Sequence, residues 1–267
     1  MLLRWLFRAW CAAVLVFLLL PIAAIVPLSF SSGSFLSYPL PGWSLRWYAE
    51  VFGMGNDGGK WLRALGNSLH VGLAATVLAV LLGTLAALGL ARQRGAWAVL
   101  LKALMLSPMI VPVILVAVGS YFFLAPLALT STFSGLILAH TVIAVPFVVV
   151  PVLTALEGLD PNLERAAAAC GAPPTMAFRR VTLPAIAPAM ASGALFAFAA
   201  SFDDVVIALL IAGPEQRTLP REMFSGLRDS ITPALTAVAT VMIVISTTLF
   251  LGMLSVQRRA RSRLVAR

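Results

Sequence analysis

Long apolar runs constrain what this chain can fold into more than any other feature of its sequence. A helix needs about 20 apolar residues to cross a bilayer, and six runs are of this length. They lie at about 9–30, 66–91, 97–122, 132–156, 187–212 and 235–256. Hydrophobic residues make up 61% of the chain and charged residues 11%, which leaves too few polar side chains to cover a water-facing surface. The sequence therefore predicts an all-α membrane protein, with one transmembrane domain of six spans over residues 1–267.

The placement of basic residues predicts the orientation. Cytoplasmic loops are enriched in Lys and Arg, where they also lie near anionic lipid. With the N-terminus inside, the cytoplasmic segments hold thirteen of the 19 Lys and Arg residues, and both termini are expected in the cytoplasm of a bacterial inner membrane. No basic stripe is interleaved with aromatic residues, so the net charge of +9 does not indicate nucleic-acid binding. The thirteen residues are Arg4, Arg8, Arg92, Arg94, Lys102, Arg165, Arg179, Arg180, Arg258, Arg259, Arg261, Arg263 and Arg267.

The predicted external segment 31–63 is too long to be a simple connector. It contains five large aromatic residues: Trp43, Trp47, Tyr48, Phe52 and Trp61. Amphipathic aromatic rings are favoured at the level of the lipid headgroups. We expect a short helix on the outer surface that anchors the chain there, and contact with an external partner is the alternative.

The predicted cytoplasmic loop 157–184, called the coupling loop below, contains signals for a short exposed helix. Asp160 is an N-cap candidate and Pro161 suits the first helical position. Gly171 stands where a left-handed residue ends a helix, and two prolines follow it. One face consists of small or apolar residues at helical spacing: Leu163, Ala166, Ala167 and Cys170. A helix with so few bulky residues suits insertion into a protein groove better than a lipid surface.

The run from Glu164 to Pro184 resembles the "EAA" loop of ABC importer permeases. Members have a Glu-Ala-Ala start, a glycine four residues after the second alanine, and a branched-x-Leu-Pro close. Positions Ala166, Gly171, Val181, Leu183 and Pro184 match this register, while Arg165 stands at the usual glutamate position, one residue after Glu164. The resemblance implies docking on an ATPase subunit through Glu164, Arg165, Ala166, Ala167, Gly171, Leu183 and Pro184.

The resemblance extends over most of the chain from about Trp43. The segments WSLRWYAEVF and LGNSLHVGLAATVLAVLLGTLAALGLAR are similar to the corresponding family segments. SFDDVVIALLIAGP, followed by TLP at 218–220, is similar to PotC-type permeases of spermidine/putrescine importers. This implies a polyamine-type cation as substrate, and relatives that import thiamine, ferric iron, opines or another small solute are the alternatives.

The family also implies the partners. A second homologous permease, two cytoplasmic ATPase subunits and an external solute-binding protein are expected, with ATP and Mg bound by the ATPase subunits and no cofactor bound by this chain. The sequence has no G-x-x-x-x-G-K-[ST] phosphate loop, which agrees with a non-catalytic subunit.

Two carboxylates are predicted in the outer half of the fifth span, at Asp203 and Asp204. A carboxylate at the bilayer centre costs about 2.5–3.5 kcal/mol on insertion scales, so such residues usually face a polar interior. Adjacent helical positions diverge by about 100°, so we expect one to face the substrate pathway while the other caps or pairs with a neighbouring helix. A purely structural role is the alternative. The same span carries small residues every four positions, which permits close helix packing; they are Ala189, Gly193, Ala197 and Ser201.

Other functional classes find less support. His70 and His140 are expected to form hydrogen bonds across helices. No catalytic set or metal-ligand spacing is present in the sequence. A stand-alone secondary transporter that relays ions through Asp203, Asp204 and His140 would show repeated halves, and it leaves the coupling loop unexplained.

Overall fold

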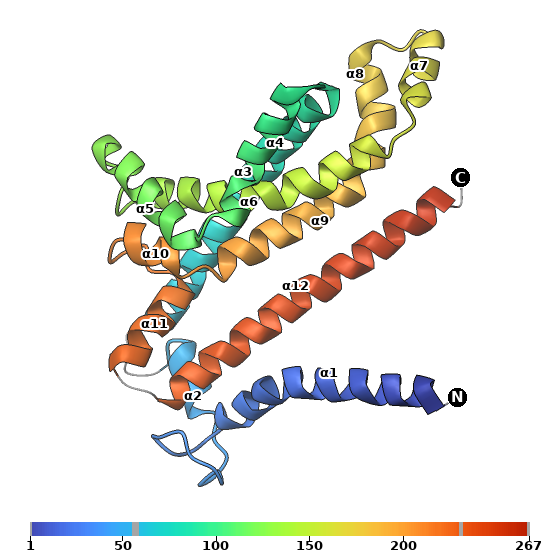
Figure 1. Cartoon of the computed structure of the whole chain (residues 1–267). Helices are drawn as coiled ribbons and strands as arrows, with labels where there is room; N and C mark the ends of the chain where they lie inside the picture. The colour runs from blue at the N-terminus through green and yellow to red at the C-terminus, as the bar shows by residue number, and fades with distance from the viewer. Residues whose placement is uncertain (1, 55–58, 230–231, 266–267) are drawn as a thin grey trace. The chain divides into compact units, whose positions relative to one another are not determined.

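The computed structural model describes residues 2–54, 59–229 and 232–265, and helices dominate this part of the chain (Figure 1). The side chains of residues 256–267, including the five predicted cytoplasmic arginines of the tail, lie outside the description. The helices are α1 Leu2–Leu28, α2 Arg46–Val51, α3 Lys60–Arg92, α4 Ala96–Ile110, α5 Val113–Leu124, η1 Ala125–Leu127, α6 Phe133–Glu157, α7 Pro161–Ala169, α8 Pro174–Ala177, η2 Phe178–Thr182, α9 Leu183–Phe202, α10 Val206–Ile211, α11 Leu219–Asp229 and α12 Pro233–Val265.

Five stretches of the described chain are long and apolar enough to cross a membrane, and a bent helix pair brings the total to six if the pair is one span. The five are Arg4–Leu28, Lys60–Arg92, Phe133–Glu157, Pro174–Phe202 and Pro233–Gly252. The prediction of an all-α membrane protein is confirmed, and these stretches overlap the predicted spans.

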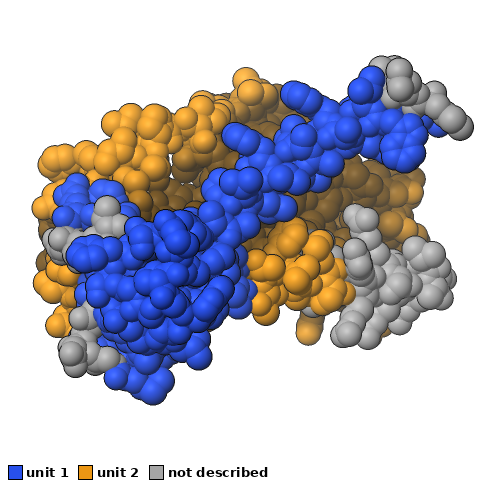
Figure 2. All heavy atoms as spheres, turned by 90° about the horizontal axis from the view of Figure 1, so that it is seen from below, with its two compact units in different colours: residues 1–64, 222–246 blue, residues 65–221, 247–267 orange. Residues whose placement is uncertain are grey.

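The contacts divide the chain into two units (Figure 2). Unit 1 comprises residues 1–64 and 222–246, and unit 2 comprises residues 65–221 and 247–267.

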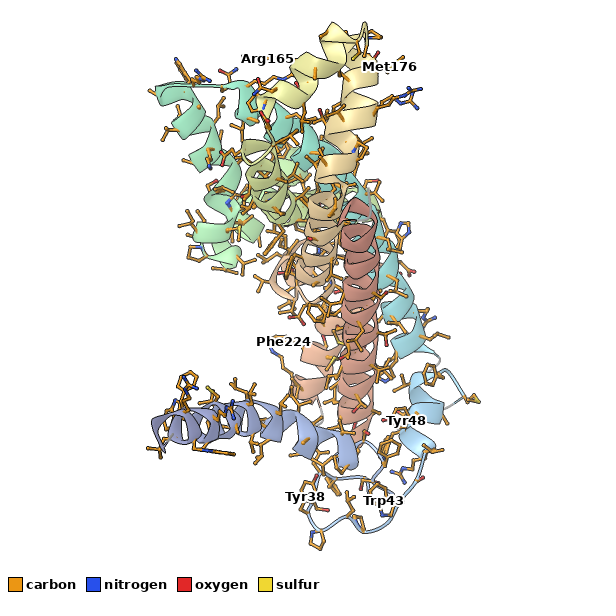
Figure 3. The ribbon with its side chains drawn as sticks, turned by 90° about the vertical axis from the view of Figure 1, so that its right-hand side faces the viewer. Tyr38, Trp43, Tyr48, Arg165, Met176 and Phe224 are labelled. Atoms are coloured by element: carbon orange, nitrogen blue, oxygen red, sulfur yellow. The ribbon has the colours of Figure 1, made fainter. Side chains whose placement is uncertain are left out.

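Unit 1 contains an ordered aromatic loop between α1 and α2. The Trp47 indole N–H donates to Ser31 O at 2.9 Å, and the hydroxyls of Ser29 and Tyr48 share a hydrogen bond of 2.7 Å. Figure 3 shows Tyr38, Trp43 and Tyr48 around this loop. Trp47 is buried while Trp43 is 74% exposed. The predicted short helix therefore exists as α2, and one of its aromatic residues serves as a core rather than as a surface anchor.

Unit 2 is built on three helices that approach closely: α3, α6 and α9. A Cβ added at Gly83 of α3 would lie 2.9 Å from Val148 Cβ of α6, and one at Gly193 of α9 would lie 2.8 Å from Val148 Cα. Helices that carry a full side chain at these positions could not come this close. Ala197, also on the predicted small-residue stripe, is fully buried. The stripe therefore packs α9 against α6, as predicted, and the two run side by side (Figure 1).

The predicted third span, 97–122, is not one continuous helix. It is broken into α4 and α5, which meet at an angle of 106°. Pro112 has no N–H to continue the hydrogen-bond ladder and disfavours helical geometry at the residue before it. Val111 accordingly adopts an extended conformation, with ψ at 133°.

The predicted fifth span, 187–212, is also not one continuous helix. α9 ends at Phe202, and a separate short helix, α10, begins at Val206. Asp203 and Asp204 thus lie in a helix break rather than within a regular helix. The Asp204 carboxylate accepts from the N–H of Ile207 at 2.8 Å and thereby starts α10, a local bond that competes with helix continuation.

Replacing Gly193 with Val should destabilise unit 2 by about 1–3 kcal/mol, the usual cost of overpacking, because α6 and α9 would have to separate. Gly89→Val is the matched control, since a Cβ at this helical position has no neighbour within 4 Å. Thermal unfolding of both variants in detergent measures the difference. Equal unfolding midpoints would show that the α6–α9 contact is not limiting for stability.

Candidate functional site

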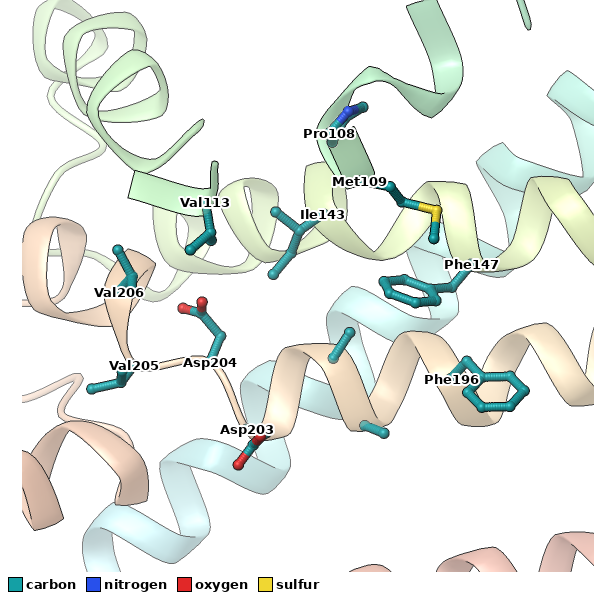
Figure 4. Close-up of a pocket in the computed structure, with 12 residues that line it drawn as sticks. Pro108, Met109, Val113, Ile143, Phe147, Phe196, Asp203, Asp204, Val205 and Val206 are labelled. Atoms are coloured by element: carbon teal, nitrogen blue, oxygen red, sulfur yellow. The ribbon is translucent and has the colours of Figure 1, made fainter. Parts of the chain in front are cut away.

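Both helix breaks of unit 2 lie at one cavity of about 620 Å³ (Figure 4). The α4–α5 region contributes Pro108, Met109 and Val113, and α6 contributes Ile143 and Phe147. The end of α9 and the break after it contribute Phe196, Ala199, Ala200, Asp203, Asp204, Val205 and Val206. The volume is in the usual range for small-molecule sites.

The two aspartates occupy different environments at this cavity. The Asp204 side chain is 7% exposed and points toward the side lined by Val113 and Ile143, whereas Asp203 points another way (Figure 4). Asp203 is exposed. The expectation that one carboxylate caps a helix is confirmed for Asp204. Asp203 also lines the cavity, and its exposed side chain can be reached by a ligand.

His140 and Ser201 form a buried polar pair next to Asp204. His140 of α6 is fully buried, and its Nδ1 shares a hydrogen bond of 2.9 Å with the Ser201 hydroxyl of α9. Its Nε2 lies 4.0 Å from Asp204 Oδ2 and has no hydrogen-bond partner among the described residues. The predicted bond across helices is confirmed for His140. His70 instead makes an edge-on ring contact with Phe133 at 5.4 Å between centroids.

The cavity has the composition of a site for an organic cation. Two carboxyl groups line it, and Phe147 and Phe196 add aromatic side chains, a type that can attract cations. Apolar walls complete the site, which suits a ligand that combines positive charge with methylene groups.

The segment after α10 is held by the start of α3. The Asn67 amide donates to the carbonyls of Glu215 and Arg217 at 2.9 and 3.0 Å, and Ser68 Oγ accepts from the N–H of Leu219 at 2.7 Å. Two segments about 150 residues apart in sequence therefore fix one another. This clamp positions α10 and, through it, the break at the cavity.

The predicted helix of the coupling loop is present as α7. The Asp160 carboxylate accepts from the N–H of Asn162 at 2.9 Å, and Pro161 is the first helical residue. Gly171 has φ of +80°, and the N–H of Ala172 donates to Ala167 O at 3.0 Å, which closes the helix end. The start, end and capping of this helix are as predicted.

The residues predicted to dock on an ATPase differ in their surroundings. Arg165 and Ala166 are exposed, Ala167 is half-buried, and Leu183 and Pro184 begin α9. Glu164 Oε1 accepts from the hydroxyl of Thr182 at 2.5 Å. Figure 3 shows Arg165 and Met176 at the end of unit 2 where α7 and α8 meet.

Several residues of these sites were not predicted as functional. Thr182 lies inside the branched-x-Leu-Pro motif at the variable position, so the motif gave no reason to select it. Ser68 and Ser201 are common small polar residues in spans, and only their partners reveal their roles. The apolar and aromatic cavity residues have no distinguishing pattern: Pro108, Met109, Val113, Ile143, Phe147 and Phe196.

An apolar helix bundle with an acidic cavity at two helix breaks, and with an exposed capped helix at one end, defines a membrane transport subunit. Residues 79–262 match the family described as binding-protein-dependent transport system inner membrane component, and the chain belongs to this family. It is therefore the membrane-embedded permease of a binding-protein-dependent importer.

Relatives and solved structures agree with this assignment. The spermidine/putrescine transport system permease protein PotC of Haemophilus influenzae is 32% identical over 240 residues, covering 90% of this chain and 91% of the relative. The putrescine transport system permease protein PotI of Escherichia coli is 34% identical, covering 85% and 82%. A crystal structure of a bacterial ABC transporter that imports alginate has the same fold, with a TM-score of 0.74, 14% identity and coverage of 95% and 96%.

Replacing Asp204 with Ala should lower stability by about 1 kcal/mol, because α10 loses the acceptor at its first turn. Asp204→Asn keeps an acceptor oxygen and should retain most of that stability. Asp203→Ala is the matched control, because no side-chain hydrogen bond ties this exposed residue to α10. Thermal unfolding of the three variants tests the assignment, and equal losses for Asp203→Ala and Asp204→Ala would contradict it.

Proposed function

We propose that the chain forms half of the pathway for a polyamine-type cation, such as putrescine or spermidine, in an ATP-driven importer. The observation that carries the proposal is the cavity at the two helix breaks, which is lined by Asp203, Asp204, Phe147 and Phe196. The names of the relatives PotC and PotI support the same substrate class.

Polyamine chemistry fits the alternation of charge and apolar surface in this cavity. Ammonium groups gain charge-assisted hydrogen bonds from carboxylates, and the methylene groups between them fit against Met109, Val113 and Ile143. Phenyl faces add cation–π attraction. A solute such as ferric iron would need a set of ligands that converge at metal-binding distances, and no group of three or more potential ligands occurs among the described residues.

The proposed complex contains a second homologous permease, two cytoplasmic ATPase subunits and an external solute-binding protein. The ATPase subunits bind ATP and Mg, so this chain itself binds no cofactor and catalyses no reaction. Both termini lie in the cytoplasm. A solved alginate ABC transporter of similar fold, with a TM-score of 0.71, was crystallised with a periplasmic protein, which supports an external delivery protein in this case too.

In the proposed mechanism α7 docks on an ATPase subunit. Its small side chains allow a close approach of the helix backbone to a groove, and its ends are capped within the chain. The hydrogen bond from Thr182 to Glu164 joins α7 to the helical stretch Pro174–Phe202, which ends at the acidic cavity. A displacement of α7 on ATP binding would thus reach the cavity through one continuous helical segment.

The complex reconstituted in liposomes with its binding protein should take up putrescine or spermidine, and not opines, thiamine or ferric iron. Asp203→Asn should raise the substrate concentration for half-maximal uptake by about tenfold, the effect of one lost charge-assisted bond. The affinity of the binding protein alone should not change. Uptake of another solute would agree with an importer but contradict the polyamine assignment. An unchanged half-maximal concentration in Asp203→Asn would show that Asp203 does not bind the substrate along the pathway.

Replacing Gly171 with Val should uncouple ATP hydrolysis from uptake while the chain stays in the membrane. A β-branched residue at a φ of +80° is strained, so the end of α7 would be displaced. Gly95→Val is a matched control, because Gly95 has a similar φ of +83° and equally open surroundings but lies outside the coupling loop. The ratio of ATP hydrolysed to substrate imported measures coupling, and a normal ratio in Gly171→Val would contradict α7 docking.

A further inference from the structure

The charges of the coupling loop are not equally available to a partner. Its three carboxylates are all engaged by the chain itself. Glu157 Oε1 lies 3.6 Å from Lys102 Nζ, Asp160 caps α7, and Glu164 accepts from Thr182. Each carboxylate therefore already has one of its oxygens engaged within the chain.

The three arginines of the same loop are in the opposite situation. Arg165, Arg179 and Arg180 are exposed, and none forms an ion pair with a carboxylate among the described residues. Arg165 makes one long side-chain hydrogen bond, 3.4 Å to Asn162 Oδ1, which leaves most of its five N–H donors available. The loop therefore presents positive charge outward.

Glu164 and Arg165 are adjacent in sequence but have different roles in this geometry. Glu164 reaches back to Thr182, which is 2% exposed at the end of η2. Arg165, one position further around the helix, points its charge toward solvent. Glu164 is thus a positioning residue that fixes α7 on the rest of unit 2, and Arg165 is the charge that a docked partner would meet.

We propose that the surface of this permease that docks on the ATPase is cationic, with Arg165 as its contact charge, and that the ATPase groove that receives α7 is acidic. This inference rests on the proposed docking of α7. Complementary charge across an interface sets association rate and partner choice. Arg165 would therefore select the ATPase subunits that carry a carboxylate at the facing position.

Anionic lipid is the other partner that exposed arginines attract. The neighbours of Arg165 on α7 favour a protein instead. Ala166, Ala168 and Ala169 are exposed small residues and Leu163 is the one bulky apolar side chain exposed on α7, whereas helices that lie on lipid bury several Leu, Phe or Trp side chains. A small-residue face gains little from lipid and gains more from a shaped groove.

The test measures the dissociation constant of the ATPase subunit from the complete permease complex in nanodiscs of phosphatidylcholine, which has no net charge. Arg165→Glu should weaken association about tenfold at low salt, and the difference should shrink at high salt because the charges are exposed. Arg165→Lys should bind within about threefold of the unmodified chain, since it keeps the charge. Arg94→Glu makes the same charge change on another exposed loop and should alter the constant less than about twofold.

A photo-cross-linking residue at position 165 identifies the facing ATPase residue. Replacing that residue with Lys should restore association with Arg165→Glu. A cross-link to the ATPase with equal affinity for Arg165→Glu and the unmodified chain would overturn this inference while leaving docking intact. Loss of binding only to vesicles that contain phosphatidylglycerol would assign Arg165 to lipid and also overturn it. Absence of any ATPase cross-link would overturn the docking proposal itself.

Discussion

The rest of this structure depends on the need of every backbone N–H and C=O in a bilayer to find a partner within the protein. An unsatisfied group in hydrocarbon costs several kcal/mol, so helices can be interrupted only where the break is buried or lines a cavity. The break at Asp203–Val205 lines the cavity itself, and the break at Val111–Pro112 is flanked by Met109 and Val113, which line the same cavity. The helix breaks and the cavity therefore occur at the same place in the fold.

Close packing of α3, α6 and α9 holds these breaks in place. Gly83 and Gly193 let both neighbouring helices approach Val148 on α6. Within two turns of Val148, Phe147 and Ile143 line the cavity on the same helix. A side chain added at either glycine would move the wall as well as weaken the bundle, so packing and the site share the same residues.

Polar side chains have a corresponding role where the chain leaves its long helices. Asp204 begins α10, and Asn67 and Ser68 hold the segment after it. Thr182, in the helical stretch Pro174–Phe202, is hydrogen-bonded to Glu164 of α7. Asp204, Asn67 and Ser68 each bind backbone groups at the start of a helix or in a connecting segment, whereas Thr182 and Glu164 join two elements through their side chains. Together they turn flexible connections into defined geometry at the cavity and at the coupling loop.

The sequence by itself determined the features that depend on local physics. Apolar length predicted the spans, and Asp160, Pro161 and Gly171 predicted α7 because capping and left-handed geometry depend on a few adjacent residues. Spacing of small residues predicted the close face of α9. The sequence also identified Asp203 and Asp204, since carboxylates in apolar surroundings are rare and costly.

Tertiary structure decided what depends on residues far apart in the chain. Pro112 predicts an interruption of the helix, but the sequence does not distinguish a kinked helix from a break of 106°. Neighbouring helices determine which of the two is tolerated. The clamp by Asn67 and the bond between Glu164 and Thr182 join partners that lie on different elements of the fold. Long-range hydrogen bonds of this kind leave no local pattern in the sequence. For that reason only the folded structure shows that Glu164 holds α7 in place while Arg165 is exposed on its surface.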